Sequence, residues 1–127
     1  MRLVRLWLPV VVWAIVILWA SDDSFSSGQS QGWLSLLLGR DVSWAVNVTI
    51  RKLGHIISYG ILGALTWRAD RRAAAAIIVA LIVAVADEWR QSLTLTRTGT
   101  PWDVLLDVAG SWLGMTVVAR VARRQRG

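Results

Sequence analysis

The chain has 127 residues, of which 55% belong to the hydrophobic set and none is cysteine. Its mean hydropathy of +0.51 is high for a soluble domain of this size, and its length favours one domain, residues 1–127. The absence of cysteine excludes a disulfide framework, a cysteine-ligated zinc and a thiol nucleophile. The net charge of +6 does not indicate nucleic-acid binding, because the basic residues stand in short runs at the ends of apolar segments.

Four apolar segments predict four membrane-spanning helices, at about residues 6–20, 53–67, 73–95 and 104–121. The second is short for a hydrocarbon core of about 30 Å, and it can extend back through residues 46–50. The third is interrupted by Asp87 and Glu88. The chain contains nine Trp but only one Phe and one Tyr. Trp favours the boundary between membrane and water.

The first segment also has features of a cleaved signal peptide. Arg2 and Arg5 precede it, and the bond between Ala20 and Ser21 is a candidate cleavage site. Three Trp residues within the segment and the bulky Leu18 just before that bond argue against cleavage. We therefore expect a retained helix.

The charges divide the chain into two sides. Seven of the eight acidic residues, all but Asp70, fall on one side or in the adjacent half of the spans. Nine of the fourteen basic residues flank the ends on the opposite side: Arg2, Arg5, Arg68, Arg71, Arg72, Arg120, Arg123, Arg124 and Arg126. The positive-inside rule then predicts a multi-pass protein of the bacterial cytoplasmic membrane with both termini in the cytoplasm.

Residues 21–51 are then expected outside the cell. They begin with a polar, Ser- and Gly-rich loop, after which residues 33–38 are apolar but too short to span. This short segment either lies along or dips into the outer interface, or packs as a cap over the bundle. The predicted fold is an all-α, four-helix transmembrane bundle with a short interfacial or re-entrant segment between its first and second spanning helices.

Ionisable groups within the spans are the unexpected feature, because each costs about 2.5–3.5 kcal/mol to insert. They form three clusters: Arg51, Lys52, His55 and Tyr59; Asp87, Glu88 and Gln91; and Asp103 and Asp107 with Ser111. At helical rise, Asp87 lies about 21 Å outward from Ala73, Asp107 about 8 Å below Trp102, and Tyr59 about 10 Å below Lys52. All three clusters therefore reach the outer third of the membrane, where helix packing can bring them together.

Two interpretations of these clusters stay open. Pairing alone, such as His55 with Asp107 or Arg97 with Glu88, would satisfy buried partners without any chemistry. A functional site is favoured because five ionisable groups converge with Tyr59 and Gln91. Lys52, Arg90 and Arg97 would lie at its rim, where cations meet a phosphate head group or extend to water.

The motifs that carry these residues resemble those of the VanZ-like membrane protein family. Arg51-Lys52-Leu53-Gly54-His55, followed by Tyr59 and Leu62-Gly63, is similar to the second-helix signature of that family. Asp87-Glu88-Trp89-Arg90-Gln91, then Arg97 and the run from Asp103 to Gly110, is similar to its third-to-fourth-helix segment. Asp107 stands where the family often has Asn, and Thr98 follows Arg97 where Gly is common. The resemblance implies a bacterial envelope protein, and the founding member of the family is linked to low-level teicoplanin resistance.

Two functions follow from these residues. The first is a binding module for an anionic lipid or glycan-lipid envelope precursor. Its expected contacts are Lys52, Tyr59, Gln91, Arg97 and Asp107. The second is an enzyme acting on such a lipid, and its candidate catalytic residues are His55, Asp87, Glu88 and Asp103. His55 would act there as a general base oriented by Asp103 or Asp107, and Asp87 and Glu88 would hold a divalent cation.

An ion-coupled transporter is less favoured, because the inner halves of the spans are apolar. A purely structural role is a further alternative. The expected partners are membrane lipids and a lipid-linked envelope precursor, with no nucleic acid. The spacing matches no recognised metal signature, and the sequence identifies neither a cofactor nor an oligomeric state.

Overall fold

The computed structural model describes residues 1–21, 27–39, 43–93, 100–125 and 127, with the side chains of residues 27–31 and 44 outside the description. The described part consists of five helices: α1 (Arg2–Ala20), α2 (Ser27–Leu38), α3 (Trp44–Ala69), α4 (Ala73–Ser92) and α5 (Pro101–Arg124). It contains no strand, so the all-α prediction is confirmed.

The helix boundaries follow the sequence signals at most ends. The second predicted segment becomes α3, whose 26 residues include the extension back towards residue 46. Ser43 caps this helix, because its side chain accepts a hydrogen bond from the Val46 backbone N–H. At α5, Pro101 occupies the first turn, where its missing N–H costs nothing. The third segment ends earlier than predicted, at Ser92.

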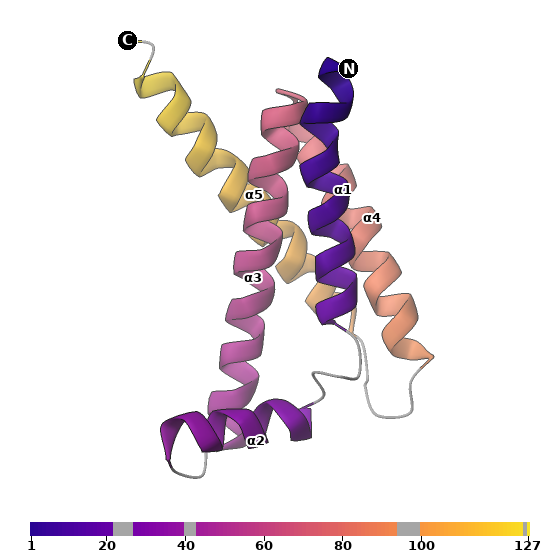
Figure 1. Ribbon diagram of the computed structural model, residues 1–127, viewed down its shortest axis with the longest axis vertical. Coiled ribbons are helices and arrows are strands. Elements are labelled where there is room, and N and C mark those ends of the chain that lie inside the picture. Colours follow the sequence, from indigo (N-terminus) through magenta and orange to yellow (C-terminus); the bar gives the residue numbers. More distant parts are fainter. Residues whose placement is uncertain (22–26, 40–42, 94–99, 126) are drawn as a thin grey trace.

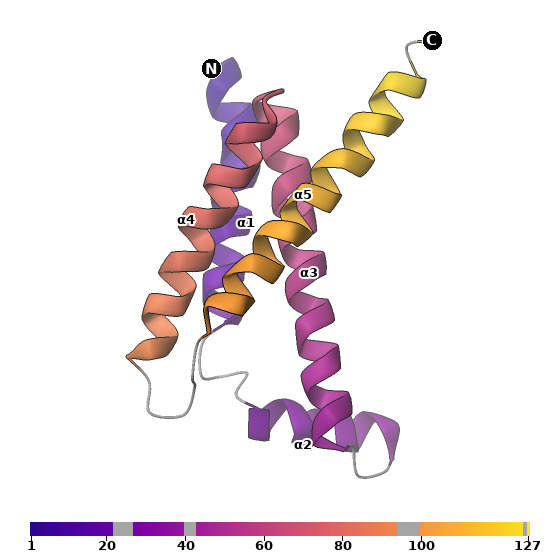
Figure 2. The same cartoon turned by 180° about the vertical axis from the view of Figure 1, so that it is seen from behind.

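Four helices run lengthwise and one lies across them (Figure 1). Both termini and the turn between α3 and α4 lie at one end, and α2 lies at the other. The most extensive contact joins α3 to α5, and α4 and α1 also pack against α3. Figure 2 shows that α5 crosses α3 and that its C-terminal part diverges from the other helices.

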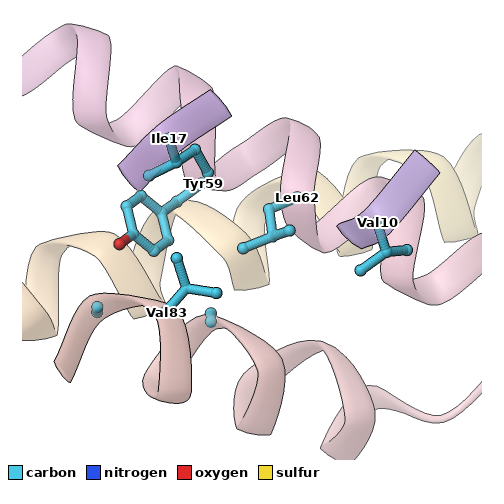
Figure 3. Packing of buried hydrophobic residues seen from close by; sticks show 7 residues of the cluster. Val10, Ile17, Tyr59, Leu62 and Val83 are labelled. Carbon is cyan, nitrogen blue, oxygen red and sulfur yellow. The ribbon is translucent and has the colours of Figure 1, made fainter. Parts of the chain in front are cut away.

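The interior of the bundle holds a small apolar cluster that four helices contribute to or pack against. Figure 3 shows members of this cluster: Ile17, Tyr59 and Val83 lie together, and Leu62 lies between them and Val10. Large apolar side chains are also exposed along every long helix, among them Leu8, Ile15, Ile57, Ile82, Leu113 and Val117. Soluble monomers rarely expose so much contiguous apolar surface.

By length and composition, two of the described helices, α1 and α5, are able to cross a membrane. α4 has similar length but gathers three charged residues, Asp87, Glu88 and Arg90, near its C-terminal end. α3 carries polar residues through its first half. Four spans were predicted. Among the described helices, length and composition support this prediction for α1 and α5 only.

The short apolar segment between the first two predicted spans forms part of α2, a helix of 12 residues. Its side chains Trp33, Leu36 and Leu37 are exposed. A cap over the bundle would have buried them against the other helices. α2 instead packs against α3 and leaves this apolar face uncovered.

Glycines allow α3 and α5 to approach until their backbones touch. A Cβ atom added to Gly63 would collide with the backbone of Ser111, and one added to Gly114 would collide with the carbonyl group of Gly60. A Cβ on Gly110 would lie 2.7 Å from the carbonyl oxygen of Ile56. Because real Cβ atoms do not come so close, these positions admit no side chain unless the helices separate.

We predict that Gly63→Ala lowers the free energy of unfolding by about 1–3 kcal/mol, the usual cost of overpacking. Gly54→Ala is the matched control on the same helix, since nothing lies within 4 Å of a Cβ there. It should leave stability unchanged or raise it by up to about 1 kcal/mol, because Ala is the better helix former. Unfolding in detergent measures both, and equal effects of the two substitutions would contradict this account of the contact.

Candidate functional site

Polar side chains on the facing surfaces of α3 and α5 form what we call the polar ladder: Lys52, His55 and Tyr59 of α3 with Asp103 and Asp107 of α5. Spacings of three or four residues place the members on one face of each helix. The ladder becomes steadily more buried from its Lys52 end to its Tyr59 end.

Side-chain exposure decreases over three successive levels of the ladder. At the first, Lys52 Nζ lies 3.9 Å from Asp103 Oδ1, and the two side chains are 58% and 35% exposed. At the second, His55 Nδ1 lies 3.2 Å from Asp107 Oδ1, with side-chain exposures of 29% and 4%. At the third, the fully buried ring of Tyr59 stacks with the His55 ring at a centroid distance of 6.3 Å.

The His55–Asp107 hydrogen bond engages Nδ1 of the imidazole ring. An ionised carboxylate only accepts, so Nδ1 carries the proton and donates it to Asp107. Nε2 is then the unprotonated nitrogen of the neutral ring. This is the same arrangement by which a carboxylate orients a histidine base in hydrolases.

A second polar group, the α1–α4 cluster, consists of Ser21, Asp87 and Gln91. The Ser21 hydroxyl donates to Asp87 Oδ2 at 2.6 Å, and the Gln91 amide donates to the same oxygen at 2.8 Å and to Ser21 Oγ at 3.0 Å. One turn earlier on α1, the carbonyl oxygen of Leu18 accepts a hydrogen bond from Arg90. Because the last carbonyl groups of a helix lack partners within it, α4 satisfies the end of α1.

The ladder and the α1–α4 cluster lie within electrostatic reach of one another. His55 interacts with Asp87 as well as with Asp107. Glu88 interacts with all three aspartates, Asp87, Asp103 and Asp107. The three clusters seen in the sequence therefore surround one region, as their depths predicted.

The structure selects one of the two residues predicted to orient His55. Asp107 rather than Asp103 orients His55, since Asp103 faces Lys52 and accepts a hydrogen bond from the Thr100 hydroxyl at 2.8 Å. Arg90, expected at the rim, bonds to the end of α1 instead. Arg97 lies outside the described residues. The predicted pairing of Arg97 with Glu88 therefore stays a prediction.

The divalent cation predicted at Asp87 and Glu88 stays a prediction. Within the described ranges, no group of three or more His, Asp or Glu side chains is arranged to hold a metal ion. One oxygen of Asp87 is already occupied by Ser21 and Gln91. The carboxylates are placed for hydrogen bonding and for charge interactions with His55.

Two polar residues that the sequence did not single out are fully or nearly buried. Ser21 opens a Ser- and Gly-rich stretch and so read as the start of a loop, yet it completes the α1–α4 cluster. Asn47 lies one turn before Arg51 on α3 and is fully buried. Asn47 lies four residues before Arg51 and eight before His55, so it shares their helix face. This spacing could have identified it from the sequence.

Two buried polar atoms make no hydrogen bond of good geometry among the described residues, the Tyr59 hydroxyl and Asp87 Oδ1, although the Tyr59 hydroxyl interacts with the Asp107 carboxylate. In Figure 3 the Tyr59 ring lies between Ile17 and Val83, and its hydroxyl points away from Leu62. A buried polar group without a partner costs about 1–3 kcal/mol.

Together these features define a class of protein: a small helical bundle with an apolar exterior and a partly open cluster of ionisable groups near one end. The chain matches the model of the VanZ/LLP1 family over residues 6–122 and belongs to that family. Two helices able to cross a membrane and this family membership indicate a membrane protein. No curated protein and no solved structure gives a significant match to the chain.

The burial gradient predicts unequal coupling along the ladder. In a double-mutant cycle, His55→Ala and Asp107→Ala should be coupled by about 1–3 kcal/mol, because their hydrogen bond is shielded from water. The exposed pair Lys52→Ala and Asp103→Ala is the control, with an expected coupling of about 0–1 kcal/mol. Unfolding of the four single and two double variants in detergent measures both cycles. Equal coupling energies for the two pairs would show that burial does not determine the strength of these interactions.

Proposed function

We propose that the chain is a multi-pass protein of the bacterial cytoplasmic membrane in which α1, α3, α4 and α5 span the bilayer. The exposed apolar side chains on all four helices suit contact with lipid. α2 would lie in the outer interface, with Trp33, Leu36 and Leu37 in the acyl region. The charged end of α4 is tolerated because Asp87 and Arg90 find partners within the bundle.

The distribution of arginine supports termini in the cytoplasm. Both termini and the α3–α4 turn lie at the end opposite α2 (Figure 1). Eight exposed arginines belong to these segments: Arg2, Arg5, Arg68, Arg71, Arg72, Arg120, Arg123 and Arg124. By the positive-inside rule this end faces the cytoplasm, and the polar ladder then opens towards the cell exterior.

Single cysteines test this topology directly, since the chain has none of its own. Leu93→Cys at the end of α4 and Gln125→Cys at the end of α5 are both at exposed positions. A membrane-impermeant maleimide should label Leu93→Cys in intact cells and Gln125→Cys only after permeabilisation. The reverse pattern would place the polar ladder on the cytoplasmic side.

The function we propose is recognition of an anionic lipid or lipid-linked envelope component at the outer face of the membrane. One observation carries it: the ladder leads from the exposed Lys52 to the fully buried Tyr59 through paired ionisable groups. Ionisable groups at such depth are expensive and mark functional sites. Lys52 and its neighbour Arg51 supply the positive charge at the open end. A link to teicoplanin susceptibility is the expectation that the family resemblance adds.

Lipid retention tests this function. Native mass spectrometry of the purified wild-type protein should detect a bound anionic phospholipid or polyprenyl-phosphate lipid. Lys52→Gln should retain about tenfold less, the scale of one lost charge-assisted hydrogen bond. Arg72→Gln at the opposite end is the control and should retain as much as wild type at the outer site. Wild-type protein free of anionic lipid would contradict the proposal.

A second candidate, an enzyme acting on the same lipid, is favoured by the orientation of His55. Asp107 holds Nδ1, so Nε2 is free to take a proton from a hydroxyl group or water at the open end. The preparations used for lipid retention distinguish the two functions. An enzyme releases an altered lipid or a soluble head-group product from wild type and at least about a hundredfold less from His55→Ala. A binding module leaves the lipid chemically unchanged in both.

A further inference from the structure

The open end of the polar ladder carries its positive charge next to a carboxylate that opposes it. Lys52 Nζ lies 3.9 Å from Asp103 Oδ1, and the two side chains are 58% and 35% exposed. Asp103 also interacts electrostatically with Arg51, the second cation at this end. One acidic side chain therefore acts on both of the cations that the proposed function assigns to an anionic head group.

The two partners of this ion pair differ in how firmly they are held. Asp103 lies in the first turn of α5, and its second oxygen, Oδ2, accepts a hydrogen bond of 2.8 Å from the Thr100 hydroxyl. A carboxylate in the first turn is also stabilised by the positive end of the helix dipole. Lys52 carries its ammonium group on a flexible four-carbon chain. Lys52 is therefore the partner that moves more easily, and Asp103 keeps a partner when it does.

The contact between Lys52 and Asp103 is one that a ligand can break. A separation of 3.9 Å exceeds hydrogen-bond length, so the attraction between opposite charges is what links the two side chains. Exposed ion pairs contribute little free energy, because water screens them. The deeper pair, His55 with Asp107, is closer at 3.2 Å and better shielded. An anionic group at the open end can therefore take Lys52 from Asp103 without disturbing His55.

We propose that Asp103 competes with the anionic head group for Lys52 and so limits how tightly the site holds its lipid. When the head group binds, Lys52 turns to it from Asp103, which keeps its contact with Thr100. The inference rests on the proposed recognition of anionic lipid and adds the residue that regulates it. Asp103 then has a role different from that of Asp107, which pairs with His55.

Removal of the Asp103 charge tests this competition. Asp103→Asn keeps the shape of the side chain and an oxygen that accepts from Thr100, but it removes the negative charge. Lys52 is the only lysine of the chain, so its acetylation by an amine reagent reports on the open end. Full-length protein in phosphatidylcholine nanodiscs is titrated with phosphatidylglycerol, and the fraction that halves the acetylation rate of Lys52 is measured. This fraction should be about two- to fivefold lower in Asp103→Asn than in wild type, the scale of one exposed ion pair.

Asp70→Asn is the matched control at the opposite end of the bundle (Figure 1). Asp70 Oδ1 lies 3.8 Å from Arg72 Nε, and its side chain is 34% exposed. The substitution therefore removes the same charge from an ion pair of nearly the same length and the acidic partner of nearly the same exposure. It should leave the protection of Lys52 by phosphatidylglycerol at the wild-type level.

A further variant separates competition for Lys52 from simple repulsion between Asp103 and the lipid. Native mass spectrometry compares the gain in retained phosphatidylglycerol that Asp103→Asn produces in the wild-type and Lys52→Gln backgrounds. Competition predicts that the gain largely disappears in Lys52→Gln, because no ammonium group is left to release. Repulsion predicts that it persists.

Thermal unfolding in phosphatidylcholine alone checks the fold of each variant, and Asp103→Ser removes the carboxylate in a second way if Asp103→Asn does not fold. Three results would overturn the inference: unchanged or weaker protection of Lys52 without the carboxylate, an equal shift in Asp70→Asn, or a gain that persists in Lys52→Gln. If phosphatidylglycerol is not retained and protects Lys52 in neither wild type nor any variant, the proposed recognition of anionic lipid is itself refuted.

Discussion

The direct backbone contact between α3 and α5 determines where the groups of the polar ladder lie. Glycines on both helices remove the side chains that would keep them apart, so His55 and Asp107 face each other at hydrogen-bond distance. The same contact reaches α4, because Ser111 of α5 donates a hydrogen bond to the carbonyl group of Ala76 at 3.1 Å. Wider separation of α3 and α5 would leave the ionisable groups buried without partners, which is far more costly than the packing itself.

The other side of the site depends on hydrogen bonds from side chains to the ends and edges of helices. Trp13 of α1 donates to the carbonyl group of Ser58, one residue before Tyr59. Ser21 and Leu18 connect the end of α1 to α4. Four helices thus contribute to one polar region, and apolar packing of Ile17, Tyr59 and Val83 closes it on the inner side. The site combines a buried interior with one accessible edge.

Periodicity and charge predicted much of this arrangement from the sequence. The apolar segments predicted the long helices, and spacings of four placed His55 with Tyr59 on one helix face and Asp103 with Asp107 on another. The similar depths of these clusters predicted that His55 and Asp107 could meet. The contacts of Ser21 and Arg90 were not predictable in that way. Their partners lie 66 and 72 positions away, and a serine at the end of an apolar run looks the same whether it enters a loop or is buried. Only the packing of α1 on α4 distinguishes the two.

The dependence of α1 on α4 also has a consequence for biosynthesis. α1 is made first, yet the groups that satisfy Leu18 and Ser21 are translated 72 and 66 residues later. During that interval the last turn of α1 must rely on water, lipid head groups or the insertion machinery for its hydrogen bonds. The last turn of α1 therefore gains these partners only after α4 has been made. A ribosome stalled before α4 would leave α1 without its hydrogen-bond partners at that end.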